Sequence, residues 1–492
     1  MNRKKLGLPT VVATGVGMII ATSCIFSLGQ GASAIGTPFI IAMLIAVAIN
    51  ICTALSLSEL NALMPDLTGG IAQFSHASFG AFITIITMVG GYIACNTIVG
   101  SAETAMFGNT IKSVLPGVPI SGTAWTIIAL IFLIVVNLNG LNVFAKIQDF
   151  VAYALIISMV IIGILGCIKI NPAAVVTQPK VLDSSLKGVT GLCSTAFFLF
   201  IGCEFVIPIA GHVKNTRRNI PLGMIISLLV VFGMQSILIF GFSNTVPWSD
   251  LAGSTTPHIL YGSLLLGKAG QIWMAIVSVL AVTSTINSQI SSVSYIILGM
   301  SKIGLLPGFL GKTNKKGAPY VGVFIVAGIM IAVNAAGLST SDQLSFLILT
   351  GCVFWMISYL FSDLACIVLR VRYPKRPRTF KLPLGPVIPL IGMAGTVYMI
   401  LNIDPDPAVR KSIYIAVGLI AAALAVYAAL WVKLVMKDKL FRPEPIEKIM
   451  EYEMGLYDSY KVRGTKIGEV EKEENWLIDE VKRKQKNLKD EI

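Results

Sequence analysis

Long apolar runs alternate with short polar stretches along most of the chain. Each run approaches the roughly 20 apolar residues that a helix needs to cross a bilayer. Twelve runs are expected, at residues 11–33, 38–60, 82–110, 123–139, 147–168, 190–211, 220–242, 267–299, 320–336, 344–369, 386–401 and 412–433. The pattern predicts an all-α polytopic membrane protein with about 12 transmembrane helices.

Two of these runs contain residues that interrupt a regular helix. The first has the small and hydroxylated stretch T-S-C at 22–24, and the sixth combines Gly202, Glu204 and Pro208. An opened helix in lipid strands backbone N–H and C=O groups at several kcal/mol each, so broken helices mark solvated cavities. Paired breaks in the first and sixth runs predict a 5+5 inverted repeat with a site at the midplane. The alternative is that the small residues only allow close helix packing.

This pattern also predicts the organisation of the chain. We expect a transmembrane domain over residues 1–436, with repeats at about 11–168 and 190–370 and two extra helices within about 386–433. A charged tail over 437–492 follows, expected to be solvated, with a regulatory plug as the alternative. At the breaks, freed amides would suit a carboxylate, and freed carbonyls would suit an ammonium group or a cation.

Composition agrees with lipid as the main solvent of the chain. Hydrophobic residues make up 55% and charged residues 13%, whereas an ordinary soluble domain has about 25% charged residues. The net charge of +13 does not indicate nucleic-acid binding, because Lys and Arg form short clusters between apolar runs. Most of these clusters fall in alternate loops. The positive-inside rule therefore predicts a multi-pass protein of the cytoplasmic (cell) membrane with both termini in the cytoplasm.

The cysteines do not suggest a disulfide framework or a metal site. All eight lie within apolar runs, and no C-x-x-C pair occurs. No cofactor and no metal are expected.

Five stretches, in order along about the first 400 residues, resemble a known family. They read E-L-N-A-L-M-P-D-L-T-G-G at 59–70, F-I-G-C-E at 200–204, V-K-N-T-R-R-N-I-P at 213–221, K-K-G-A-P at 315–319 and R-T-F-K-L-P-L-G-P at 378–386. One such match is weak, but five in the right order are specific. The chain resembles the amino acid–polyamine–organocation (APC) superfamily of permeases, which have the leucine-transporter fold.

The resemblance implies a secondary transporter, a permease or exchanger, that moves an amino acid or related amine across the cytoplasmic membrane by alternating access. The expected partners are this small-molecule substrate, the lipid bilayer and a coupling proton or counter-substrate, with no nucleic acid. No Walker sequence and no acid–base or metal constellation of an enzyme is visible. A non-transporting amino-acid or amine sensor and a polyamine or organic-cation exchanger remain as alternatives.

Two departures from the family pattern affect the expected substrate and coupling. The family usually has G-S-G-I-F in the first run, where this chain has T-S-C-I-F at 22–26. The change reshapes the carboxylate-binding pocket, which favours an amine or a small modified amino acid over a standard α-amino acid. A lysine that some proton-coupled relatives carry in the fifth run is absent, since the matching position falls near Ala154 or Leu155.

The candidate site residues come from the two breaks and the eighth run. The substrate-binding candidates are Ala21, Thr22, Ser23, Cys24, Ile25, Phe197, Phe198, Phe200, Ile201, Gly202, Cys203, Asn287 and Gln289. Glu204 is a candidate for proton coupling or gating, because a carboxylate at membrane depth costs at least about 2.5 kcal/mol. Glu103 is the second such candidate, expected nearer the outer end of the third run. For Glu204 the structural alternative is an acid satisfied by neighbouring helices, and for Glu103 it is a carboxylate at the outer end, where its charge costs little. Asp363 is predicted to pair with Arg370 or Arg372 at the basic inner end of the tenth run.

Overall fold

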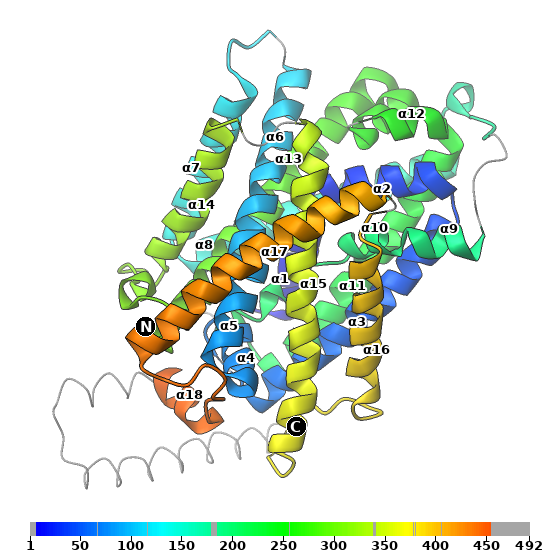
Figure 1. The fold of residues 1–492 in the computed structure, drawn as a ribbon. Coiled ribbons are helices and arrows are strands. Elements are labelled where there is room, and N and C mark those ends of the chain that lie inside the picture. The colour runs from blue at the N-terminus through cyan, green and yellow to red at the C-terminus, as the bar shows by residue number, and fades with distance from the viewer. Residues whose placement is uncertain are drawn as a thin grey trace, which may run out of the picture.

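The computed structural model describes residues 6–65, 67–115, 117–178, 185–254, 256–337, 341–376, 378, 380–404 and 406–453. These residues form helices and connecting loops (Figure 1). Within these ranges the only strand-like pairing is an isolated parallel bridge between Leu6 and Val213.

The α-helices are α1 (Leu8–Ile19), α2 (Thr22–Ile35), α3 (Phe39–Leu63), α4 (Ile71–Phe79), α5 (Ala81–Met88), α6 (Cys95–Val114), α7 (Gly122–Leu138), α8 (Leu141–Cys167), α9 (Leu186–Gly191), α10 (Cys193–Phe198), α11 (Thr216–Thr245), α12 (Trp248–Gly253), α13 (Pro257–Lys302), α14 (Tyr320–Ala335), α15 (Ser341–Arg372), α16 (Val387–Leu401), α17 (Pro407–Leu430) and α18 (Ile446–Glu453). Shorter 3₁₀ turns are η2 (Pro172–Ala174), η3 (Cys203–Val206), η4 (Ala210–His212) and η5 (Gly308–Gly311), and π-helical segments are η1 (Val89–Ala94) and η6 (Trp431–Met436).

The predicted all-α membrane fold is confirmed. Within the described residues, seven continuous helical spans are long and apolar enough to cross a membrane, and the bent pair α1 and α2 can count as an eighth. Four shorter apolar segments, at Gly122–Leu138, Cys193–Val206, Tyr320–Ala335 and Val387–Leu401, coincide with the remaining predicted runs. The apolar pattern therefore located every run, because lipid-facing and core-facing positions are both apolar in such a helix.

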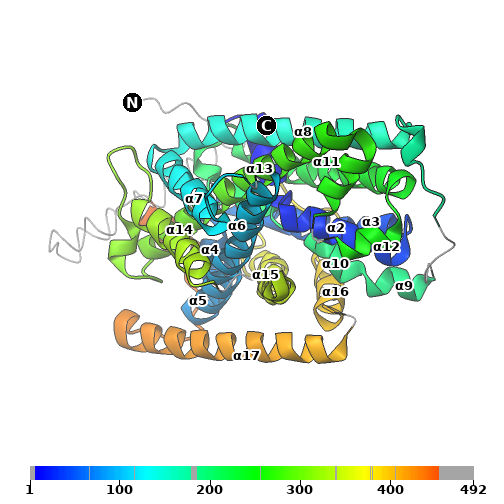
Figure 2. The ribbon, with the colours of Figure 1, turned by 90° about the horizontal axis from the view of Figure 1, so that it is seen from above.

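The helices form a bundle with α1 in its interior. Helix α1 packs against α8, α11 and α13, and its residues from Thr10 to Ile19 are buried. Viewed from above, α8 lies along one edge of the bundle and α17 along the opposite edge, with α15 between α17 and the centre (Figure 2). Among the described residues, no other helix packs against much of the surface of α17, where Leu419 is 69% exposed, as expected for a helix that faces lipid.

Both predicted breaks are present. Helix α1 ends at Ile19, the backbone is extended at Ile20 and Ala21, and α2 leaves at an angle of 59° to α1. In the sixth run, α10 ends at Phe198 and the chain continues through a turn at Gly202 into the 3₁₀ turn η3. Gly202 has φ of 122°, a conformation that side chains rarely adopt, so glycine at this position allows the break.

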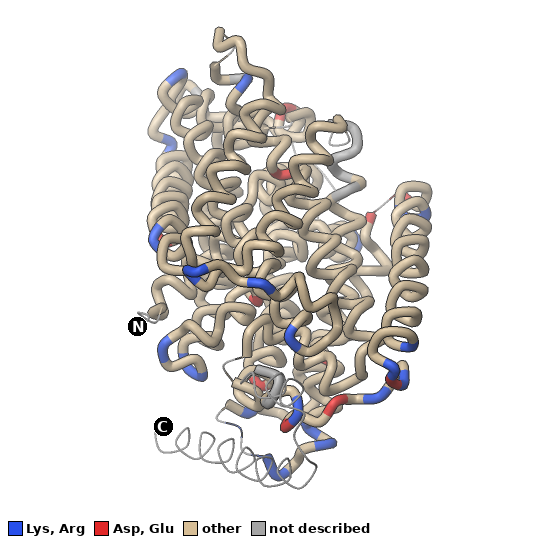
Figure 3. The backbone as a smooth tube through the Cα atoms, turned by 90° about the vertical axis from the view of Figure 1, so that its left-hand side faces the viewer, with Lys and Arg blue, Asp and Glu red and all other residues tan. Residues whose placement is uncertain are grey.

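One end of the bundle carries most of the positive charge. Figure 3 shows Lys and Arg gathered mainly in the lower half of the molecule. Here Glu59, near the end of α3, accepts hydrogen bonds from the Arg370 guanidinium on α15 and from the Leu382 N–H, at 2.8 Å. The Arg378 Nε lies 3.5 Å from the same carboxylate.

The expected pairing of Asp363 with Arg370 or Arg372 is therefore wrong. Asp363 Oδ2 accepts a hydrogen bond from the Thr53 hydroxyl at 3.0 Å, and Asp363 is fully buried between α15 and α3. Helix α3 runs beside α15 and supplies Thr53 to Asp363 and Glu59 to Arg370, partners that the sequence of α15 alone does not reveal.

The charged tail begins with a docked segment. The Phe82 N–H donates to the Leu440 carbonyl at 3.2 Å, and the Glu444 N–H donates to the His76 carbonyl at 3.2 Å. Ile446 and Ile449 are fully buried where α18 packs against α4 and α13. The expectation of a fully solvated tail is wrong for this segment, because its two isoleucines cover apolar surface. Residues 454–492 lie outside the described residues.

Candidate functional site

The two breaks lie beside a small internal cavity. Its lining comes from both breaks and from α6, α13 and α15: Met18, Ile19, Ala21, Ser23, Cys24, Val99, Glu103, Phe198, Ile201, Thr285, Gln289 and Trp355. A Cβ added to Gly202 would lie 2.8 Å from the Met18 Cγ, so the breaks approach each other closely. The cavity has room for about one water molecule, which makes this a closed arrangement of the site.

Side chains satisfy the carbonyl groups freed at the end of α1. The Thr285 hydroxyl on α13 lies 2.9 Å from the Gly17 carbonyl oxygen and 3.0 Å from that of Ile20. The Cys24 thiol donates to the Ile19 carbonyl at 2.8 Å. Because a freed carbonyl in a membrane interior must find a donor, these bonds stabilise the open turn without a ligand.

Glu103 satisfies the amides freed at the start of α2. The Thr22 N–H donates to Glu103 Oε2 at 3.0 Å, and the Ser23 N–H donates to Glu103 Oε1 at 2.9 Å. The Glu103 side chain is 0% exposed. The expectation that Glu103 lies near the outer end of its run is wrong. A π-helical segment precedes α6, and the crossing of α6 over α2 carries the carboxylate to the break.

Glu204 connects the broken sixth run to α15. The Trp355 indole N–H donates to Glu204 Oε1 at 2.7 Å, and the Tyr359 hydroxyl donates to Glu204 Oε2 at 2.6 Å. The Gly202 N–H in turn donates to the Tyr359 oxygen at 3.3 Å. Glu204 is fully buried but does not line the cavity, whereas Trp355 does.

The predicted site residues divide into two groups. Those that line the cavity are Ala21, Ser23, Cys24, Glu103, Phe198, Ile201 and Gln289. Those that do not are Thr22, Ile25, Phe197, Phe200, Gly202, Cys203, Glu204 and Asn287, although the Thr22 amide holds Glu103. The prediction missed the lining residues Met18, Ile19, Val99, Thr285 and Trp355. Met18 and Ile19 directly precede the break and could have been found from it, while Val99 and Trp355 carry no signal in the sequence.

Asn287 belongs to a separate polar cluster. Its Oδ1 accepts from the Asn137 amide at 3.0 Å, and its Nδ2 donates to Gln148 Oε1 at 3.1 Å. Gln148 Nε2 donates to the Ser284 hydroxyl at 2.8 Å. These bonds join α7, α8 and α13 by side chains that are all buried.

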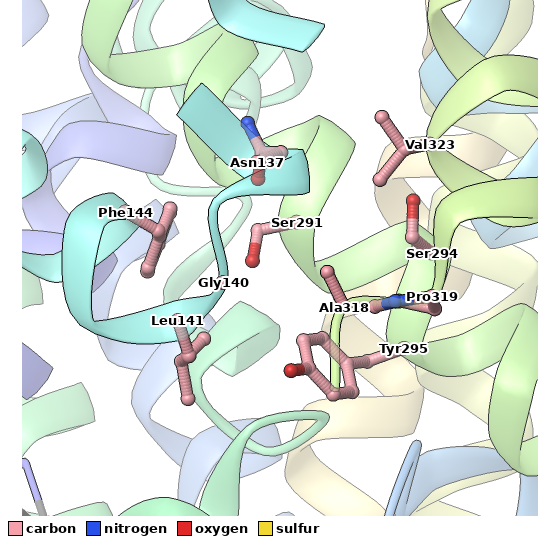
Figure 4. Close-up of a pocket in the computed structure, with 10 residues that line it drawn as sticks. All are labelled: Asn137, Gly140, Leu141, Phe144, Ser291, Ser294, Tyr295, Ala318, Pro319 and Val323. Atoms are coloured by element: carbon pink, nitrogen blue, oxygen red, sulfur yellow. The ribbon is translucent and has the colours of Figure 1, made fainter. Parts of the chain in front are cut away.

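A second cavity lies next to this cluster. It is lined by Asn137, Gly140, Leu141, Phe144, Ser291, Ser294, Tyr295, Ala318, Pro319 and Val323. Figure 4 shows Ser291 and Tyr295 from α13 on one side of it and Leu141 and Phe144 from α8 on the other. Its lining contains none of the predicted site residues and no carboxylate, whereas the lining of the cavity at the breaks contains Glu103.

In the part of the chain that the structure describes, no three His, Cys, Asp or Glu side chains lie together in a way that could hold a metal ion. All eight cysteines are free thiols.

An apolar helical bundle with two broken segments beside a small buried cavity that contains a carboxylate defines a multi-pass membrane protein of the transporter class. A family model described as "Amino acid permease" matches residues 6–430, and the chain belongs to this family. The family expected from the sequence motifs is therefore confirmed.

Relatives and a solved structure agree with this assignment. The chain is 27% identical over 440 residues to the branched-chain amino acid permease BcaP of Bacillus subtilis, covering 85% of this chain and 92% of the relative. It is 23% identical over 357 residues to the putrescine transporter PotE of Haemophilus influenzae, covering 71% and 80%. A crystal structure of a manganese transporter of Eremococcus coleocola has the same fold, with a TM-score of 0.53, 14% identity and coverage of 87% and 94%.

Proposed function

We propose that the protein is a secondary transporter that moves an amino acid or a related amine across the cytoplasmic membrane by alternating access. Membership in the amino acid permease family supports this proposal, as do the relatives whose names state branched-chain amino acid or putrescine transport. The observation that carries it is the cavity between the α1–α2 break and the α10–η3 break. The family and these relatives are transporters, which supports transport rather than catalysis.

In the proposed mechanism, the breaks serve both as substrate site and as hinges. Backbone groups at each break are held by side chains of other helices, Thr285 and Glu103 at the first and Tyr359 at the second. Because these bonds link elements far apart in the chain, exchanging them for bonds to a substrate would change how the helices pack. Glu204 would act on the same hinge through Trp355 and Tyr359.

The proposed topology places both termini in the cytoplasm. The end of the bundle that carries the Glu59 and Arg370 pair is rich in Lys and Arg, which supports its assignment as the cytoplasmic end. A coupling proton or a counter-substrate is part of the proposal, since a secondary transporter needs one of them to concentrate its substrate. The domain limits proposed are those expected from the sequence, 1–436 for the transmembrane domain and 437–492 for the tail.

Flux into proteoliposomes tests the proposal. Purified protein is reconstituted and tested with a panel of labelled amino acids and amines, both for net uptake and for exchange against internal unlabelled solute. We expect saturable flux for at least one compound of the panel. Binding without flux would favour a sensor on the same scaffold, and no binding of any compound would contradict the proposal.

A glycine pair provides a matched control for the hinge. Gly202→Ala introduces a side chain at φ of 122° beside Met18, within the break, and should reduce flux at least tenfold. Gly304→Ala also introduces a side chain at a positive φ, of 75°, where no atom lies within 4 Å of the new Cβ, and should retain flux. Equal losses in both variants would show that backbone strain alone, and not the break, limits transport.

A further inference from the structure

The first observation concerns the donors at the start of α2. The Thr22 and Ser23 amides both donate to Glu103, one to each carboxylate oxygen. The Ala21 N–H donates to the Ile19 carbonyl, and the Ile25 N–H donates to the Ala21 carbonyl. A helix N-terminus attracts a carboxylate through a set of free amides. Here the chain's own carboxylate fills that position, so no free pair of amides remains for the carboxylate of a solute.

The second observation concerns the charge of the cavity. Its lining contains one carboxylate, that of Glu103, and no Lys, Arg or His. The one indole of the lining, that of Trp355, already donates its N–H to Glu204. The carboxylate of an α-amino acid in this cavity would lie near Glu103, and the lining holds no side-chain cation to offset the repulsion, which is large in a site shielded from water.

The third observation is an acceptor without a donor. Gln289 belongs to the lining and is only 1% exposed, and its side-chain oxygen Oε1 has no hydrogen-bond partner among the described residues. A buried acceptor without a donor costs about 1–3 kcal/mol, so a ligand with N–H groups would gain by satisfying it. The lining also offers the aromatic rings of Phe198 and Trp355, which attract cations.

From these observations we propose that Glu103 is the resident counter-ion of the cavity and selects an ammonium-bearing solute that has no α-carboxylate. The Thr22 and Ser23 amides hold the carboxylate in place, and one ammonium group of the solute pairs with it and with Gln289 Oε1. Part of the lining near the break is apolar, with Met18 and Ile201, and this part takes a short alkyl chain rather than a second charge. This inference rests on the proposed function and names the substrate class of the same site.

The test compares each amine with the amino acid that yields it on loss of the carboxylate. Uptake and binding of isobutylamine and valine, and of isoamylamine and leucine, are measured with the reconstituted full-length protein. We expect each amine to bind at least tenfold more tightly than its amino acid. Putrescine and ornithine extend the series, and both should bind more weakly than isoamylamine because they carry a second ammonium group.

Three variants separate the role of Glu103 from a general effect on folding. Glu103→Gln keeps an acceptor for one amide but removes the charge, and should weaken amine binding at least tenfold. Glu103→Ala also frees the Thr22 and Ser23 amides, and should improve valine or leucine binding while abolishing amine binding. The matched control is Asp149→Asn on α8, whose carboxylate accepts from the Thr10 hydroxyl at 2.9 Å outside the cavity and which should leave both preferences unchanged.

The outcomes distinguish this inference from the proposed function. If valine or leucine is taken up and the matching amine does not inhibit this uptake, the inference is overturned and the proposed function still stands. Such a result would indicate that a solute carboxylate displaces Glu103 from the amides. Amine binding that is unchanged in Glu103→Gln would remove Glu103 from the selection. Absence of binding and flux for every compound tested would overturn the inference together with the proposed function.

Discussion

The carboxylate of Glu59 provides the most quantitative test of the packing between α3 and α15. Glu59 is 2% exposed and pairs with the Arg370 guanidinium, whose side chain is 15% exposed. It also accepts from the Leu382 N–H at 2.8 Å and lies 3.5 Å from the Arg378 Nε. Glu59→Gln removes the negative charge but keeps the shape of the side chain, so two guanidinium groups lose their counter-ion.

The expected cost follows from the burial of this cluster. Removing one partner of a buried ion pair costs about 3–5 kcal/mol, and the partial exposure of Arg370 places the value near 3 kcal/mol. If the pair is broken in the transition state for unfolding, the half-time of heat unfolding should shorten by roughly 100-fold at a fixed temperature. The assay follows unfolding of the purified protein in nanodiscs, where the rate is the relevant measure of stability for a large membrane protein.

A control variant has the same change in charge at an exposed site. Asp438→Asn breaks the pair of Asp438 with Arg442, whose side chain is 62% exposed, and should cost less than about 1 kcal/mol. The double variant Glu59→Gln with Arg370→Gln should recover part of the loss, because one unpaired guanidinium is removed with its partner. A Glu59→Gln variant that unfolds within threefold of the rate of Asp438→Asn would refute this account of the cluster.

Three further predictions concern the sixth run, a tight helix contact and the docked tail segment. Glu204→Gln should retain folding but change the pH dependence of flux, and an unchanged profile would remove Glu204 from proton coupling. Gly299→Ala places a Cβ 2.2 Å from the Thr68 carbonyl oxygen and should destabilise the protein by about 1–3 kcal/mol in the same unfolding assay; Gly328→Ala meets no atom within 4 Å and should not destabilise it. Burial lowers the pKa of His76, in α4 outside the apolar runs, from 6.5 to about 4, so its neutral form is favoured when the segment after α17 is docked. Docking should therefore weaken as the pH falls from about 6.5 to about 4, and the Glu444 carboxylate of the docked segment, which favours protonated His76, makes the loss smaller. Protease cleavage after Lys and Arg in that segment measures this; cleavage independent of pH in this range, or equally dependent in His76→Phe, would contradict it.

Much of the fold could be predicted from the sequence. The order and limits of the apolar runs, and the interruption of two of them, depend on residues that are adjacent in the chain. The break in the first run follows from the T-S-C stretch at 22–24, and the break in the sixth from Gly202 near Pro208. Local composition is enough here, because a helix in lipid cannot open without residues that permit it.

The candidate site was only partly accessible in this way. Seven of the predicted residues line the cavity, as the break positions indicated, but Trp355 was missed because it sits in an otherwise ordinary apolar helix. Glu103 was recognised as a candidate for coupling or gating but placed too near the outer end of its run, since nothing near it in the chain shows which helix crosses it. The pairing of Glu59 with Arg370 was likewise missed, because these residues are 311 positions apart.

The sequence by itself determined an apolar chain with many membrane spans and two helix breaks, since hydropathy and helix interruption depend on a few neighbouring residues. Only the tertiary structure decided which groups form hydrogen bonds with the backbone N–H and C=O groups freed at those breaks. The Thr22 amide and the Glu103 carboxylate are 81 residues apart, and Trp355 and Glu204 are 151 apart. Their meeting depends on how each helix is rotated and crosses its neighbours, and that is set by the packing of the whole bundle.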